Sequence, residues 1–141
     1  MSATSFYQGV LRDHYRNPRN YADLGGADVV RRGSNPRCGD DVEVGIYCEG
    51  DLLKQVRFRG RGCSVCIASA SLMTEAVAGK SRVAAHQMAD EMKRWFNSGD
   101  GSHVPDPPES LRALSAVQGY PARRRCVLLA WEALDDALAV A

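Results

Sequence analysis

The stretch VEVGIYCEGDLLKQVRFRGRGC, residues 42–63, decides the fold of this chain. Apolar and polar residues alternate over residues 42–48 and again over residues 53–59, which predicts two strands that each bury one face. The intervening Glu49-Gly50-Asp51 is typical of a hairpin connection. Glycines in residues 60–62 predict that the second strand breaks there. An antiparallel hairpin is therefore the expected centre of the fold.

Helices and one further strand are expected around this hairpin. We predict a strand over residues 27–31 and helices over residues 5–15, 64–78, 82–96, 109–117 and from Pro121 onward. The last helix is expected to present to the core Val127, Trp131, Leu134 and Leu138. Residues 33–40 are rich in Gly, Asn and Pro, which predicts a tight loop. The pattern indicates an α+β fold, a three-stranded antiparallel sheet with helices packed on one side.

The composition narrows the possible classes of protein. The chain has 141 residues, of which 45% are hydrophobic and 25% charged, with a net charge of +1. This favours one folded domain over residues 1–141, with a flexible insertion at about 97–108, rather than a disordered chain. The absence of a Lys and Arg surplus argues against a nucleic-acid partner. Neither a long apolar stretch nor a signal peptide is apparent, so we expect a cytoplasmic protein without a membrane partner.

Cysteine is the most informative residue type. The five cysteines stand at positions 38, 48, 63, 66 and 126. Their odd number and the lack of an export signal favour reduced thiols over a disulfide framework. Cys48 falls within an alternating strand pattern, and we interpret it as a small buried apolar residue. The other four lie beside glycines or predicted element ends, where a metal or redox role is more plausible.

Three cysteines and one aspartate are predicted to meet at element ends. Cys38 and Asp40 flank a glycine before a strand, Cys63 precedes a helix, and Cys126 lies near the start of the last helix. Three thiols and a carboxylate at one point would form a tetrahedral site of a kind that Zn²⁺ accepts. Spacing alone leaves this open, because ligands of structural zinc sites usually stand closer in sequence. Residues 123–125, all arginine, add positive charge beside Cys126.

Cys63-Ser64-Val65-Cys66 is a C-x-x-C motif with two possible readings. Such a motif at a helix start can be a redox pair of the thioredoxin kind. The preceding hairpin argues against this reading, because the expected βαβ setting is missing. The alternative is that Cys66 is a spare thiol near a metal site, which exchanges as a ligand or resolves an oxidised partner.

Several motifs follow one another in a recognisable order. They are Tyr7 with residues 13–20, then residues 35–40, 60–63 and 68–71, and finally Arg125-Cys126. Together they resemble the iron–sulfur cluster assembly proteins of the IscU/NifU N-terminal type, over residues 5–138. Scaffold-type members carry His where this chain has Arg125, and a shorter path than the 62 residues between Cys63 and Cys126. Both departures resemble the SufU-like subgroup.

The resemblance implies a zinc-dependent sulfur acceptor, a sulfurtransferase-type carrier whose status as an enzyme stays open. Its partners would be a pyridoxal-phosphate cysteine desulfurase of the SufS type, which supplies persulfide sulfur, and downstream iron–sulfur scaffold proteins. By resemblance, the zinc ligands are Cys38, Asp40, Cys63 and Cys126. Cys38 would accept the sulfur, Asp40 would be a labile ligand, and Arg125 would stabilise the anionic persulfide. The alternatives are a scaffold for a transient [2Fe–2S] cluster on the same ligands, and a structural zinc module for docking.

The histidines and the remaining arginines are also assigned expected positions. His14 is expected to pack or cap, and His86 and His103 to lie on the surface. A basic surface around the site, facing an acidic or loop-rich partner, is expected from Arg57, Arg59, Arg61 and residues 123–125.

Overall fold

The computed structural model describes residues 3–37, 39–97 and 109–141. Along the chain lie α1 (Ala3–Arg16), β1 (Val29–Asn35), β2 (Asp40–Glu49), β3 (Leu52–Arg61), α2 (Ser64–Val77), α3 (Arg82–Asn97), the 3₁₀ helix η1 (Glu109–Val117) and α4 (Pro121–Val140). Cys38, His103 and nearly all of the proposed flexible insertion lie outside the described residues. The assignment of a single domain stays a prediction.

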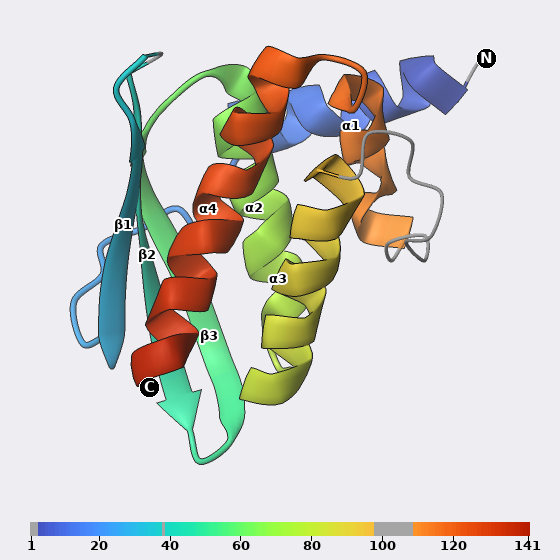
Figure 1. Ribbon diagram of the computed structural model, residues 1–141. Coiled ribbons are helices and arrows are strands. Elements are labelled where there is room, and N and C mark those ends of the chain that lie inside the picture. The colour runs from blue at the N-terminus through green and yellow to red at the C-terminus, as the bar shows by residue number, and fades with distance from the viewer. Residues whose placement is uncertain (1–2, 38, 98–108) are drawn as a thin grey trace.

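The three strands form one antiparallel sheet in the order β1-β2-β3, and the helices cover one of its faces (Figure 1). The predicted fold class is confirmed. Strand β3 nevertheless continues through Gly60 to Arg61, where a break was predicted, and Arg61 pairs with Asp41. Gly60 has φ +133°, and a Cβ there would stand 2.1 Å from the carbonyl oxygen of Asp41. The glycine thus permits a close approach of two strands and does not end one.

The loop predicted for residues 33–40 is shorter in the structure. Strand β1 extends to Asn35, which pairs with Asp40 at the start of β2. The backbone N–H of Gly39 donates to the carbonyl oxygen of Asn35 at 2.9 Å. The ladder to β2 therefore overrides the weak strand preference of the Gly, Ser and Asn residues.

The core lies between the sheet and the helices. Val44 and Ile46 of β2 and Val56 and Phe58 of β3 are fully buried beneath the helices. Helix α2 packs against β3, α1 and α4, so it is buried on almost every side. The predicted core face of α4 is buried at Val127, Trp131 and Leu134, and partly buried at Leu138. Over the described ranges, no helix has the length and apolar character required to cross a membrane.

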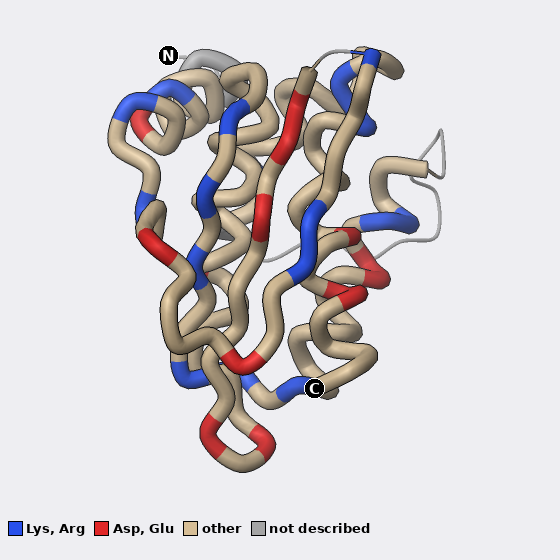
Figure 2. The backbone as a smooth tube through the Cα atoms, turned by 90° about the vertical axis from the view of Figure 1, so that its left-hand side faces the viewer, with Lys and Arg blue, Asp and Glu red and all other residues tan. Residues whose placement is uncertain are grey.

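The opposite face of the sheet carries paired charges. Figure 2 shows acidic residues on β2 between basic residues on its two neighbours. Arg59 contacts Glu43 at 3.1 Å, and the guanidinium of Arg57 lies 4.8 Å from the centre of the Tyr47 ring. Arg57 and Arg59 therefore lie on the open face of the sheet and contact partners there. They were predicted to surround the cysteines, and they do not.

One end of the sheet collects the elements that carry the predicted ligands. The turn from β1 to β2, the link from β3 to α2 and the first turns of α4 lie together at the upper end of the view (Figure 1). Asp40 opens β2, Cys63 directly precedes α2, and Cys126 lies in the second turn of α4. The fold thus brings residues from distant parts of the sequence to one end of the molecule.

Candidate metal centre

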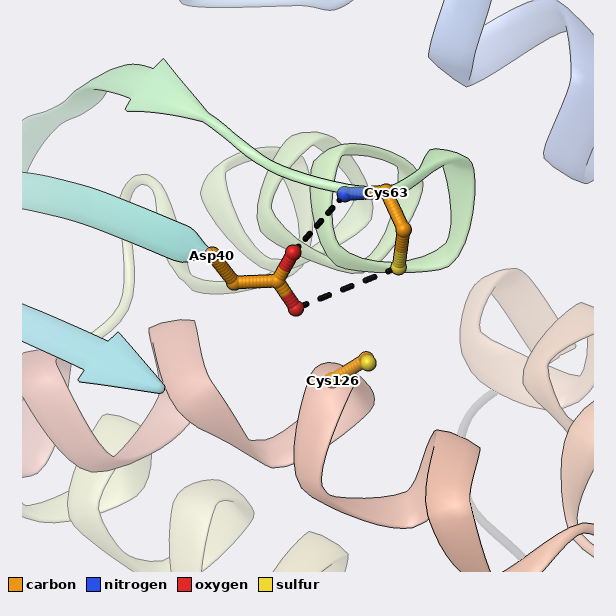
Figure 3. Close-up of side chains that lie close together, drawn as sticks. All are labelled: Asp40, Cys63 and Cys126. Carbon is orange, nitrogen blue, oxygen red and sulfur yellow. Dashed lines mark hydrogen bonds between the residues drawn. The ribbon is translucent and has the colours of Figure 1, made fainter. Parts of the chain in front are cut away.

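Asp40, Cys63 and Cys126 point toward one another at this end of the sheet (Figure 3). Their ligand atoms all lie within 4.8 Å of one another. Three of the four predicted ligands are therefore close together, although they come from a strand and two helices. The fourth, Cys38, is outside the described residues; its neighbours in sequence, Arg37 and Gly39, belong to the turn between β1 and β2.

Asp40 links the sheet to the start of α2. Its side chain is almost completely buried, with 1% of the residue exposed. Oδ1 accepts the backbone N–H of Cys63 at 2.8 Å, and Oδ2 lies 3.9 Å from the Cys63 sulfur. A carboxylate in this position is favoured by the exposed N–H groups of the helix N-terminus. The same contacts fix its orientation toward the two thiols.

Cys63 is the N-cap of α2. Its backbone is extended, with φ −65° and ψ 167°, and its sulfur accepts the backbone N–H of Cys66 at 3.5 Å. The thiol thus takes the place of the Ser, Asp or Asn oxygen usual at such a position. The cap holds the half-buried sulfur over the first turn of the helix, facing Asp40.

Cys126 completes the cluster from the opposite side. It is 3% exposed, and its thiol contacts the carbonyl oxygen of Ala122 at 3.8 Å. Burial raises the pKa of the Cys126 thiol far above its ordinary value, and the neighbouring Asp40 and Cys63 raise it further. Burial and the neighbouring donors therefore disfavour a thiolate at Cys126 as long as no cation is bound.

The chemistry of this donor set fits Zn²⁺. Thiolates with a carboxylate oxygen are ligands that zinc accepts, and a divalent cation would favour the Cys126 thiolate, which burial and the neighbouring Asp40 and Cys63 disfavour. Asp40, Cys63 and Cys126 are the described residues that can hold the ion. Their roles as ligands stay predictions.

The three arginines at the start of α4 have different neighbours. The exposed guanidinium of Arg123 has its pKa raised by the charge of Cys63, by a hydrogen bond with it, and by Cys126. Arg124 instead donates to the carbonyl oxygen of Gln118 at 3.0 Å. Arg125, predicted to stabilise a persulfide, lines a surface hollow with Asn35, Pro36, Arg37, Pro121 and Ala122. Arg123 thus faces the thiols, and Arg125 faces the turn that leads to Cys38.

Helical spacing could have identified Arg123 from the sequence. Residues three apart lie on one side of a helix, so Arg123 and Cys126 share a face, whereas adjacent residues do not. The family motif points instead to Arg125, because that residue directly precedes the cysteine.

The other predicted residues lie outside the cluster. Cys66 is fully buried in the core, and Cys48 is only partly buried, with its N–H bonded to Asp28 at 2.6 Å. His14 is buried, and its Nδ1 lies 2.7 Å from the hydroxyl of Ser71, which agrees with a packing role. His86 is exposed as expected.

Comparisons with known proteins add a second line of evidence. The family described as "NifU-like N terminal domain" matches residues 6–126. The chain is 36% identical to "Zinc-dependent sulfurtransferase SufU" of Bacillus subtilis, over 96% of this chain and 90% of that protein. It is 34% identical to "Iron-sulfur cluster assembly scaffold protein IscU" of Streptococcus pyogenes serotype M1, over 94% of this chain and 82% of that one.

Solved structures agree with the fold. A crystal structure described as a putative iron–sulfur cluster assembly scaffold protein for the SUF system, from Fervidobacterium islandicum, superposes with a TM-score of 0.81. The two chains are 26% identical, and the match covers 97% of this chain and 99% of that one. The N-terminal part of a NifU-like protein from Brucella abortus gives a TM-score of 0.82 at 21% identity, over 94% and 92% of the chains, which shows the shared fold.

Proposed function

This chain belongs to the family of NifU-like N-terminal domains, and we propose that it is a zinc-dependent sulfur acceptor for iron–sulfur cluster assembly. The observation that carries the proposal is the convergence of Asp40, Cys63 and Cys126 at one end of the sheet, with Arg123 facing the thiols. The similarity to the sulfurtransferase SufU over nearly the whole chain supports it. The sulfur comes from the persulfide of a pyridoxal-phosphate cysteine desulfurase of the SufS type.

Asp40, Cys63 and Cys126, with Cys38 as the fourth ligand, would hold the zinc ion. Bound zinc keeps the thiols deprotonated at neutral pH and has no redox chemistry of its own. The Cys63 N–H orients the carboxylate of Asp40, and the burial of Cys126 excludes water from its side of the site. The protein acts in the cytoplasm, where thiols remain reduced.

The transfer exchanges one sulfur–sulfur bond for another. The Cys38 thiolate attacks the terminal sulfur of the desulfurase persulfide. A bond forms between that sulfur and Cys38, the bond within the donor persulfide breaks, and the donor cysteine leaves as a thiolate. Arg125, which lies beside the turn that leads to Cys38, stabilises the new anionic persulfide. A downstream iron–sulfur scaffold protein then receives the sulfur.

A scaffold function is the second candidate, and the named IscU relatives favour it. The same thiolates and carboxylate are ligands that a [2Fe–2S] cluster accepts. The two functions differ in the first species bound: a single sulfur atom on Cys38, or iron with sulfide. A purely structural zinc module for docking is a third possibility, and it predicts no sulfur transfer to this chain.

The rate of alanine release from cysteine by a SufS-type desulfurase tests the proposal. The rate is measured in excess reductant with zinc-loaded protein, zinc-stripped protein and the variants Cys38→Ala and Cys48→Ala. Zinc-loaded protein and Cys48→Ala should stimulate release, whereas stripped protein and Cys38→Ala should not. If zinc-loaded protein gives no stimulation and anaerobic iron with sulfide yields a coloured cluster, the scaffold function holds instead.

The arginines allow a more specific test. Arg123→Met removes the charge that faces two ligands and should lower zinc affinity by about 10–100-fold, as changes around metal ligands do. Arg125→Met should leave zinc affinity unchanged and reduce the stimulated rate. Arg124→Met is the matched control, because Arg124 binds the Gln118 carbonyl, and it should change neither quantity. Equal effects of Arg123→Met and Arg125→Met on both quantities would contradict this division of roles.

A further inference from the structure

The C-x-x-C motif places a second thiol directly beneath the site. Cys63 caps α2, and its sulfur accepts the N–H of Cys66, so it lies over the helical turn that contains Cys66. A C-x-x-C whose first cysteine stands at a helix N-terminus is the arrangement in which dithiols and disulfides interconvert readily. Of the two thiols in this motif, only Cys63 belongs to the proposed zinc site.

Gly62 shows the direction in which the Cys66 sulfur points. A Cβ built on Gly62 would lie 3.0 Å from the Cys66 sulfur and 2.9 Å from Oδ1 of Asp40. The Cys66 sulfur therefore lies behind the metal centre, toward its carboxylate, and not on the far side of α2. The absence of a side chain at Gly62 leaves the space in which these atoms approach one another.

We propose that Cys63 and Cys66 form a reversible disulfide when zinc leaves the site. The bond removes a zinc ligand, so it switches sulfur acceptance off, and it protects Cys63 from irreversible oxidation. This consequence rests on the proposed function, in which Cys63 binds zinc. The formation of the bond itself requires only the thiols of Cys63 and Cys66 and does not depend on the proposed function.

Hydrogen peroxide is the oxidant in this reaction. The Cys63 sulfur attacks one peroxide oxygen, the O–O bond breaks, and the products are a Cys63 sulfenic acid and water. The Cys66 sulfur then attacks the sulfenic sulfur, an S–S bond forms, and the hydroxyl group leaves as water with the Cys66 proton. Two thiols lose two electrons, one peroxide gains two, and a thiol reductant reverses the change.

Burial determines the order of these steps. Cys63 is half-buried and is open to a small oxidant, whereas Cys66 is 0% exposed and can act only on a neighbouring oxidised sulfur. Cys126 is the rival partner, because its sulfur also lies near Cys63. Cys66 is favoured because it is in the same helical turn, while Cys126 belongs to another helix and contacts the Ala122 carbonyl.

The sequence supplies a convenient readout. Cleavage after Arg61 and Lys80 releases residues 62–80, a peptide that contains Cys63 and Cys66 and no other cysteine. Full-length protein, zinc-loaded or chelator-stripped, is treated with hydrogen peroxide, unfolded in an alkylating reagent and digested. From stripped protein, the peptide should lack alkyl groups and be lighter by two hydrogen atoms; from zinc-loaded protein, it should carry two alkyl groups. Reductant added before alkylation should restore both thiols.

Two variants serve as controls. In zinc-stripped Cys66→Ala protein, hydrogen peroxide should oxidise Cys63 to sulfinic acid, which reductant does not reverse. Cys48→Ala should behave as the wild type. The proposal is overturned if stripped wild type yields sulfinic acid at Cys63 beside an alkylated Cys66, or a cross-link from Cys63 to the peptide that begins at Cys126. These outcomes are decided on wild-type protein, so they hold even if Cys66→Ala fails to fold. Zinc content is measured separately; protein that binds no zinc but forms the disulfide would refute the proposed function alone.

Discussion

Helix α4 contributes to two clusters of ionisable side chains, and the charges in them are arranged in opposite ways. Near the end of α4, Asp135 lies between two basic side chains, 2.5 Å from Nδ1 of His86 and 2.7 Å from Nζ of Lys93. Near its start, Cys126 meets Asp40 and Cys63, which are further potential anions. The first cluster is balanced by residues of α3, and the second has an excess of negative donors.

The shifts in pKa follow this difference. Burial acts to raise the pKa of Asp135, but hydrogen bonds from Lys93 and His86, together with their charges, outweigh it and hold that pKa below its ordinary value. At Cys126, burial, Asp40 and Cys63 all raise the pKa. A balanced cluster fastens two helices together, whereas a buried excess of anionic donors is suited to a cation.

The largest effect is expected from removal of a donor at the metal centre. Cys126→Ala should lower zinc affinity by more than about 100-fold, because loss of a ligand exceeds the effect of a residue that only supports one. Bound zinc is measured by elemental analysis after gel filtration. Asp135→Asn, the matched change in the balanced cluster, should leave about one zinc per chain. Retention of zinc by Cys126→Ala would contradict the assignment.

A fall in pH should affect the two clusters differently. Zinc binding requires the thiols to lose protons, so zinc affinity should fall as pH falls from 8 to 6, by up to about tenfold per pH unit for each proton displaced. The contact between Asp135 and Lys93 should persist over this range: the folded-state pKa of Asp135 is lowered, so the stabilisation from its charge is present above about pH 3.8 and is lost as pH falls through the folded value. Competition with a chelator at several pH values measures the first quantity. A pH-independent zinc affinity would argue against thiolate ligands.

A moderate loss of stability is expected from the balanced cluster. Asp135→Asn removes the charge from two hydrogen bonds and should lower the free energy of unfolding by about 1–3 kcal/mol. Urea unfolding of the zinc-free protein measures this change. Asp136→Asn alters the exposed neighbouring acid and should change stability by less than about 0.5 kcal/mol. Equal losses for the two variants would show that the Asp135 cluster does not fasten α3 to α4.

The smallest effect is expected at His14, a buried base outside both clusters. Burial, and then the charge of Arg19, lowers the pKa of His14 below its ordinary value of 6.5. The unfolded chain therefore binds the proton more readily, so the free energy of unfolding should fall as pH falls below about 6.5. His14→Gln should reduce this slope in zinc-free protein unfolded by urea. Identical slopes in the two proteins would show that His14 does not contribute.

The sequence predicted the elements well because their signals are local. Alternation over residues 42–48 and 53–59 identifies two strands without knowledge of their neighbours. The end of β3 was missed because Gly60 is required by its contact with Asp41, and that contact exists only after the strands pair. A glycine that permits close approach and a glycine that breaks a strand look the same in sequence.

The site, like the strands and helices, was predictable where local sequence signals sufficed. Cys63 and Cys126 were expected together because each stands near a helix start, and the fold brings those ends together. The division between Arg123 and Arg125 was missed, because it depends on the face of α4 that each side chain occupies. The close approach of the Cys66 sulfur to Gly62 depends on packing in three dimensions, which no local sequence pattern encodes.

The position of the transferred sulfur tests the central claim most directly. Cys48→Ala protein, zinc-loaded or zinc-stripped, is incubated with a SufS-type desulfurase and cysteine, alkylated and cleaved after Arg37 and Lys54, which leaves Cys38 as the one cysteine of its peptide. The account predicts one additional sulfur atom on that peptide, in zinc-loaded protein and not in stripped protein. Equal labelling of Cys38 in stripped protein, or sulfur on the peptide of residues 62–80 instead, would contradict it.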